Sequence, residues 1–164
     1  MLAKQKNRNS IAASLFKVCC SLLLVLWVMT GSSQAQTDSK KATPVLQDYK
    51  GVKIGMKVDE VREKLGKAKN EDKDGLVYTF SDYETVQIVL DGEQKVRTIS
   101  IMYDADFQKP LKFEDVFGKS VEPEKQAGGA IYKLISYPDS GYWVSYNRMA
   151  GEKAMTIVVM QKLP

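Results

Sequence analysis

Histidine is absent from this chain of 164 residues, and cysteine is nearly so. The only two cysteines, Cys19 and Cys20, lie in an apolar N-terminal stretch, which leaves none in residues 36–164. Without histidine, neither a Ser-His-Asp nor a Cys-His catalytic arrangement is available, and a zinc site loses most of its usual ligands. Without further cysteines, residues 36–164 have neither a disulfide nor thiol chemistry. We therefore expect no enzyme, no catalytic residues, no metal and no cofactor.

Acidic residues are missing from residues 1–35, which do contain basic ones. Lys4, Lys6 and Arg8 precede the apolar stretch 18–30, and Ser33-Gln34-Ala35 follows it. This layout is typical of a secretory signal peptide cleaved after Ala35. The stretch is short for a membrane span, which takes about 20 residues. We expect a periplasmic or secreted protein, and the alternative is an uncleaved anchor in the inner membrane.

The apparent positive charge of the chain belongs to this N-terminal segment. The sequence has 24 Lys and Arg against 20 Asp and Glu, and the excess lies within residues 1–35. Residues 36–164 are therefore neutral overall and give no reason to expect nucleic acid as a partner. Residues 36–49 begin with a polar run and are expected to form a flexible tether. Residues 50–164 are long enough to form one folded domain.

One pattern occurs twice in the predicted domain, as repeat one (50–104) and repeat two (110–164). Each repeat begins with a short helical segment that ends at a Gly-Lys pair, residues 57–66 and 110–118. Each continues with three strand-like runs separated by turn signals: 76–80, 85–90 and 96–103, then 130–136, 141–147 and 154–161. The repeat predicts an α+β fold. Two tandem units, each a helix plus antiparallel strands, would form one sheet with the short helices on one face.

Residues 51–67, GVKIGMKVDEVREKLGK, resemble the helix motif of the BamE/SmpA-like (SmpA/OmlA-like) family of outer-membrane assembly lipoproteins. The likeness lies in Ile54-Gly55-Met56, in the acidic helix start Asp59-Glu60 and in Leu65-Gly66. The doubled arrangement looks like β-lactamase inhibitory protein-like folds, in which two such units form one sheet with an exposed concave face. The resemblance implies an envelope protein that binds other proteins. This chain departs from the family in lacking a lipobox cysteine, in having Ala68 at the usual proline position and in having a second repeat.

Alignment of the two repeats assigns strand residues to the two faces of the predicted sheet, because successive side chains point to opposite sides. Aligning Thr98 with Thr156 places Ile157 and Val159 on the helix-covered face, and aligning Tyr78 with Tyr132 places Tyr132 and Leu134 there. The other face mixes polar with large apolar residues, as protein-binding surfaces do. The expected protein-binding residues on this open face are Trp143, Met102, Met160, Val89, Gln87, Thr98, Val158 and Lys133. The alternative is that Trp143 lies beneath a loop or the N-terminal tether.

Two acidic clusters have structural explanations. Asp59, Glu60 and Glu63 alternate with Lys and Arg, as on a solvated helix face. Residues 71–75 partly match the composition of a calcium loop but lack its ordered ligand spacing and terminal glutamate. We therefore interpret the first cluster as helix surface and the second as a hydrophilic turn.

These observations predict a secreted or periplasmic protein-interaction module, an accessory in outer-membrane protein assembly or envelope maintenance. Its partners would be proteins of the cell envelope, and only an uncleaved N-terminal segment would bring it to the membrane. One alternative is a secreted inhibitor of a hydrolase that uses the same open face. The other is a small-ligand-binding protein, which would require an enclosed apolar pocket.

Overall fold

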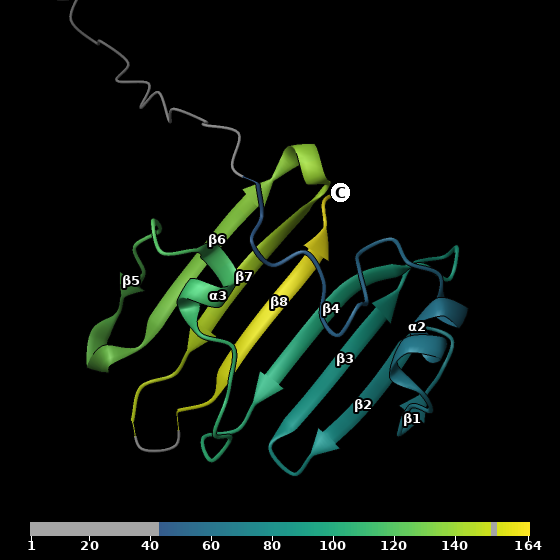
Figure 1. Ribbon diagram of the computed structural model, residues 1–164, viewed down its shortest axis with the longest axis horizontal. Coiled ribbons are helices and arrows are strands. Elements are labelled where there is room, and N and C mark those ends of the chain that lie inside the picture. Colours follow the sequence, from purple (N-terminus) through teal and green to yellow (C-terminus); the bar gives the residue numbers. More distant parts are fainter. Residues whose placement is uncertain (1–42, 152–153) are drawn as a thin grey trace, which may run out of the picture. The chain divides into compact units, whose positions relative to one another are not determined.

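The computed structural model describes residues 43–151 and 154–164, which belong to one compact unit, Lys40–Pro164. Its framework is a single eight-stranded antiparallel sheet in the order β1-β2-β3-β4-β8-β7-β6-β5 (Figure 1). The strands are β1 (Asn70–Glu71), β2 (Gly75–Ser81), β3 (Glu84–Leu90), β4 (Val96–Tyr103), β5 (Glu124–Lys125), β6 (Ile131–Tyr137), β7 (Tyr142–Arg148) and β8 (Thr156–Lys162). The fold is thus α+β, as the sequence predicts.

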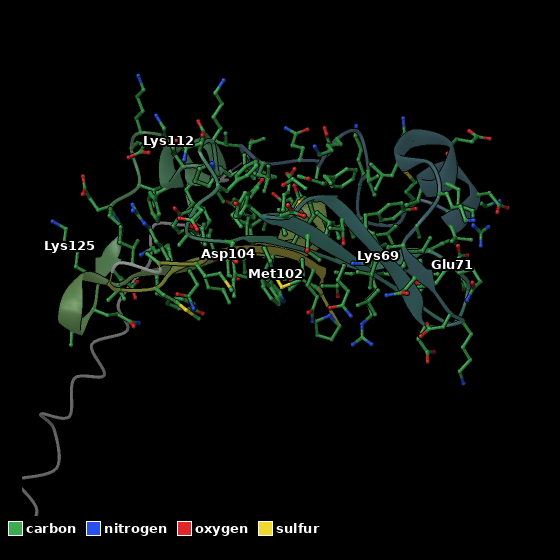
Figure 2. All side chains as sticks on the ribbon, turned by 90° about the horizontal axis from the view of Figure 1, so that it is seen from below. Lys69, Glu71, Met102, Asp104, Lys112 and Lys125 are labelled. Carbon is green, nitrogen blue, oxygen red and sulfur yellow. The ribbon has the colours of Figure 1, made fainter. Side chains whose placement is uncertain are left out.

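Two short α-helices, α2 (Val58–Leu65) and α3 (Phe113–Phe117), lie on the same face of the sheet (Figures 1 and 2). They begin alike, because the backbone N–H of the residue before each helix donates to an acidic side chain three residues on, at 3.0 Å in both. They also end alike, at Gly66 and Gly118, whose positive φ values suit glycine. Two 3₁₀ turns, Ala127–Gly129 and Pro138–Ser140, complete the described secondary structure.

The core lies between the sheet and these helices. Strand pairing places one apolar row across six strands: Leu76, Ile88, Ile99, Met160, Val144 and Ile135. The adjacent row on the same face contains Tyr78, Val86, Ile101, Val158, Tyr146 and Lys133. The seam between β4 and β8 is fully buried on this side, since Ile99, Ile101, Val158 and Met160 have no exposed surface. This seam joins the four N-terminal strands to the four C-terminal ones.

Residues 43–57 pass over the helix-bearing face of the sheet before entering α2 (Figure 1). Leu46, Tyr49 and Val52 are buried there. The Leu46 carbonyl accepts a hydrogen bond from the Tyr142 hydroxyl at 3.1 Å, and the Tyr49 hydroxyl donates to the Glu84 carboxylate at 2.6 Å. The prediction of a flexible tether as far as residue 49 is therefore wrong for residues 44–49. The buried side chains of Pro44, Leu46 and Tyr49 anchor them to the sheet.

The six long strands match the predicted runs to within about two residues at each end. The two outermost strands, β1 and β5, were not predicted, because each is only two residues long and exposed. Short, polar edge strands discourage pairing with other chains. The predicted signal peptide lies outside the described residues. Within the described residues, no helix has the length and apolarity needed to cross a membrane.

Candidate functional sites: an uncharged sheet face and a cleft beside α3

The sheet face opposite the helices, here called the open face, is the underside of the molecule in Figure 2, where Met102 is labelled. Strand pairing arranges its side chains in three rows across β2, β3, β4, β8, β7 and β6. The first row is Thr79, Thr85, Met102, Ile157, Asn147 and Tyr132. The second is Val77, Gln87, Ser100, Val159, Ser145 and Leu134. The third is Gly75, Val89, Thr98, Gln161, Trp143 and Ser136.

Within these six strands, no position in the three rows holds Asp, Glu, Lys or Arg. At the edge of the sheet, Glu124 of β5 pairs with Tyr132 and ends the first row with a carboxylate. This is unusual in a chain in which 27% of residues are charged. Arg97 is the extra residue of a bulge in β4 and stands outside the paired rows. The rows are nevertheless partly accessible, and Leu134 is 44% exposed. A sheet face exposed to solvent normally carries charged side chains. Rows that combine small polar with large apolar residues are more typical of a protein-binding surface.

Five of the eight predicted binding residues lie on the open face. Val89, Thr98 and Trp143 share one row, Gln87 lies in the middle row and Met102 in the remaining one. The structure therefore brings Val89, Thr98 and Trp143 to one end of the face. The rows also separate Met102 from Trp143, although both lie on the same side of the sheet.

The placement of Val158, Met160 and Lys133 on the open face is wrong. Val158 pairs with Ile101 and Met160 with Ile99, so both point into the core and have no exposed surface. Lys133 pairs with the buried Tyr146, which also faces the helices. Directly opposed residues in an antiparallel pair point to the same side, and a shift of one residue reverses every side chain.

The open-face residues that sequence reasoning missed are the neighbours of the misplaced ones: Ile157, Val159, Tyr132 and Leu134. The alignment of Thr98 with Thr156 displaced β8 by one residue. Because Ile157–Met160 is a run of four apolar residues, its pattern gives no alternation that could correct the error. The pairing of β8 with β4, whose residues do alternate, determines which side each β8 residue faces. That pairing cannot be inferred from the sequence.

The acidic clusters serve local structure. Arg62 forms ion pairs with Asp59 and Glu71 on the surface of α2. In the turn before β2, one Asp72 carboxylate oxygen accepts hydrogen bonds from the backbone N–H groups of Asp74 and Gly75, at 2.8 and 3.0 Å. The part of the chain that the structure describes contains no group of three His, Cys, Asp or Glu residues arranged to hold a metal ion.

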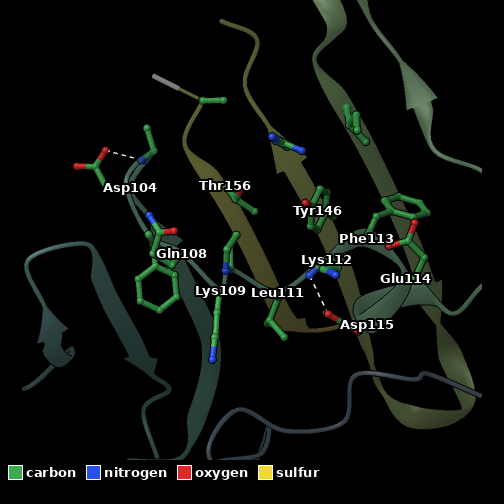
Figure 3. A pocket seen from close by; sticks show the side chains of 16 residues that line it. Asp104, Gln108, Lys109, Leu111, Lys112, Phe113, Glu114, Asp115, Tyr146 and Thr156 are labelled. Atoms are coloured by element: carbon green, nitrogen blue, oxygen red, sulfur yellow. Dashed lines mark hydrogen bonds between the residues drawn. The ribbon is translucent and has the colours of Figure 1, made fainter. Parts of the chain in front are cut away.

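A cleft of about 850 Å³ opens on the helix-bearing face, between residues 104–112, α3 and the ends of β6, β7 and β8 (Figure 3). Aromatic rings form much of its floor. Phe113 packs edge-to-face on Tyr146 with ring centroids 5.5 Å apart, and Phe107 stacks on Tyr103 at 5.0 Å. Burial raises the pKa of Tyr146, and a hydrogen bond with the Thr156 side chain partly opposes that rise.

Charged side chains of both signs line this cleft: Asp104, Lys109, Lys112, Glu114, Asp115 and Arg148. Two of the carboxylates already accept backbone hydrogen bonds, Asp104 from Ala105 at 2.7 Å and Asp115 from Lys112 at 3.0 Å (Figure 3). None of the three cations forms an ion pair with a residue that the structure describes. The cleft was not predicted, because its walls come from segments far apart in the sequence.

Comparison of the chain with protein-family models, with curated proteins and with solved structures found no match in any of the three.

Proposed function

We propose that this chain is a protein-interaction module of the cell envelope that binds its partner through the open face. The observation that carries the proposal is the absence of charge from all three rows of a sheet face that remains accessible. Burying these rows desolvates no ion within them, whereas their valine, isoleucine, methionine and tryptophan side chains gain free energy from burial. The charge-free pattern therefore favours a macromolecular surface.

The size of the open face is compatible with this role. Six strands of about seven residues, spaced about 4.8 Å apart with a rise of about 3.3 Å per residue, cover roughly 650 Å². A standard protein interface buries about 800 Å² on each partner. The buried core beneath β4 and β8 gives the face a rigid support, which lowers the entropy lost on binding.

The envelope location in this proposal comes from the sequence of residues 1–35, with its basic start, apolar stretch and small residues before the expected cleavage site. An accessory role in outer-membrane protein assembly or envelope maintenance is the more specific form of the proposal. An inhibitor of a secreted hydrolase would use the same face, and the identity of the captured partner separates the two.

We also propose that the sheet consists of two tandem units, α2 with β1–β4 and α3 with β5–β8. Support comes from the strand order, which runs β1 to β4 up to the seam and β8 to β5 beyond it, and from the similar capping of the two helices by Glu60 and Asp115. An antiparallel seam is what a two-fold axis perpendicular to the sheet would produce. Both units then contribute to one continuous open face.

The experiment that tests the binding proposal places a charge on the open face. Gln87→Lys introduces a cation in the middle row, and Gln126→Lys makes the same exchange at an exposed position in the loop before β6. Each variant of the full chain, with a C-terminal tag, is cross-linked in intact cells and purified, and the captured proteins are quantified by mass spectrometry. We expect Gln87→Lys to reduce partner capture at least tenfold, because it buries an unpaired charge in the interface.

Gln126→Lys is expected to capture as much partner as the unchanged chain, and both variants should keep the unchanged chain's unfolding temperature. Equal capture by all three proteins would overturn the assignment of the open face. Loss of capture by Gln126→Lys alone would point to the loop before β6 as the binding surface.

A further inference from the structure

We infer that the cleft beside α3 is a second binding site, for a small amphiphile that joins an apolar body to one anionic head group, a carboxylate or a phosphate ester. This site lies on the helix-bearing face, so it is separate from the open face and does not depend on the proposed protein partner. The inference rests on three features of the described residues: residues 105–112 have no backbone pairing with a strand, aromatic rings form the floor, and the cations of the lining lack ion-pair partners.

The segments that precede the two helices differ in their attachment to the sheet. Before α2, the Gly55 N–H donates to the Val96 carbonyl and the Val96 N–H donates to the Met56 carbonyl, both at 2.8 Å. These two hydrogen bonds attach this segment to the start of β4. Within the described residues, no backbone–backbone hydrogen bond joins residues 105–112 to a strand. This segment contacts β4 through side chains instead: the Leu111 backbone is hydrogen-bonded to the Tyr103 side chain, and the Phe107 ring stacks on Tyr103. Because α3 is also three residues shorter than α2, the sheet beneath it is less fully covered. The cleft is the space left by this difference.

The floor of the cleft suits an apolar body. Phe113, Tyr146 and Thr156 are buried, while Phe107 and Leu111 are only partly buried and present apolar surface to the opening. Figure 3 shows Leu111, Phe113 and Tyr146 around the same space. A volume of about 850 Å³ lies within the range of small-molecule sites, which are largely apolar with a few polar groups that set orientation.

The charged groups favour an anionic head. Arg148 lies at the end of β7, where its pairing with Thr156 puts it on the same side as Tyr146. Its guanidinium has no ion-pair partner among the described residues, and neither have Lys109 and Lys112. The carboxylates of Asp104 and Asp115 already accept hydrogen bonds, whereas guanidinium and ammonium groups can only donate. Glu114, the third acidic residue of the lining, is exposed. The three cations are the charged groups that can donate to a head group, and an arginine fork matches a carboxylate or phosphate.

The test compares probes that share one apolar chain and differ in head group: decanoate, decyl phosphate and decyltrimethylammonium. Each is titrated, below its micelle concentration, into the full chain at pH 7.5. Calorimetry measures the dissociation constant and amide NMR shifts locate the site. We expect an anionic probe to bind at least tenfold more tightly than the cation and to shift Leu111, Tyr146 and Thr156. Preference for decanoate or for decyl phosphate distinguishes a fatty-acid-like from a phospholipid-like ligand.

Matched variants assign the head-group contact. Arg148→Gln is expected to weaken anion binding about tenfold, the size expected for loss of a charge-assisted hydrogen bond. Arg97→Gln, the same exchange at an exposed position in the β4 bulge, should leave it unchanged. Equal binding of anionic and cationic probes, or equal effects of the two variants, would overturn the anion assignment. Absence of binding, or shifts confined to open-face residues such as Met102 and Trp143, would overturn the cleft as a site. Neither result bears on partner capture through the open face.

Discussion

At the scale of single residues, Glu84 is the most consequential polar group of the core. It is only 8% exposed, accepts a hydrogen bond from the Tyr49 hydroxyl at 2.6 Å and lies 3.6 Å from the Lys50 ammonium. Lys50 also covers the Phe80 ring, with its Nζ 4.4 Å from the ring centroid. A buried carboxylate needs such partners. This cluster therefore attaches residues 43–57 to the sheet and helps to keep the core beneath them buried.

We predict that Tyr49→Phe lowers the free energy of unfolding by about 1–3 kcal/mol, because it leaves the buried Glu84 carboxylate without its hydrogen-bond donor. Urea denaturation measures the change. The control is Tyr83→Phe, the same loss of a hydroxyl from a tyrosine that is 43% exposed, for which we expect a change within about 0.5 kcal/mol. Equal effects of the two substitutions would contradict a special role for the Tyr49–Glu84 contact.

At the scale of elements, strand β8 decides how the two faces of the sheet are built. It pairs with β4 on one side and with β7 on the other, and its residues alternate between the core and the open face. Val158 points into the core and Val159 onto the open face. Two adjacent valines in one strand therefore have opposite environments.

This pair provides a direct test of strand register. We predict that Val158→Ala lowers the free energy of unfolding by roughly 2–3 kcal/mol, through lost burial and an unfilled cavity. Val159→Ala removes the same atoms from a partly exposed site and should cost about 1 kcal/mol or less, yet weaken partner capture. Both values come from chemical denaturation. A larger loss of stability for Val159→Ala than for Val158→Ala would mean that Val159 is the core residue, which would contradict the assignment of the open face.

The helices and strands were predictable because each depends on neighbours in the sequence. The runs 76–80, 85–90 and 96–103 alternate or are β-branched and end at turn signals, and Gly66 and Gly118 mark the ends of the helices. The faces of β6 and β8 were not predictable. Residues 131–137 mix apolar and polar side chains without a clean alternation, and Ile157–Met160 has none. Only pairing with β7 and β4 determines which side each residue faces.

At the scale of the whole molecule, buried tyrosines make the free energy of unfolding depend on pH in the alkaline range. Burial raises the pKa of Tyr49, Tyr103, Tyr137, Tyr142 and Tyr146. A hydrogen bond from Tyr49 to the Glu84 carboxylate adds to the rise of that residue's pKa. In the unfolded chain these phenols ionise near pH 10. Above that pH the folded state holds more protons than the unfolded state.

We therefore predict that stability is retained below about pH 10 and falls as the pH rises beyond it, because the unfolded state gains by ionising phenols that the folded state keeps neutral. Urea midpoints measured from pH 8 to pH 11.5 test the expectation. Tyr103→Phe removes one contribution and should make the decline less steep. A flat profile to pH 11.5 would contradict this linkage.

By itself, the sequence determined the number and order of the long strands, the two short helices and the class of the fold, because hydrophobic periodicity, turn residues and helix ends act over a few residues. The tertiary structure alone decided three other properties. It set the register of β8, which puts Ile157 and Val159 on the open face, and it buried Leu46 and Tyr49 in the core. It also formed the cleft beside α3 from segments that are distant in the chain. Each of these depends on contacts between residues far apart in sequence, where a shift of one position reverses a side chain from one face to the other.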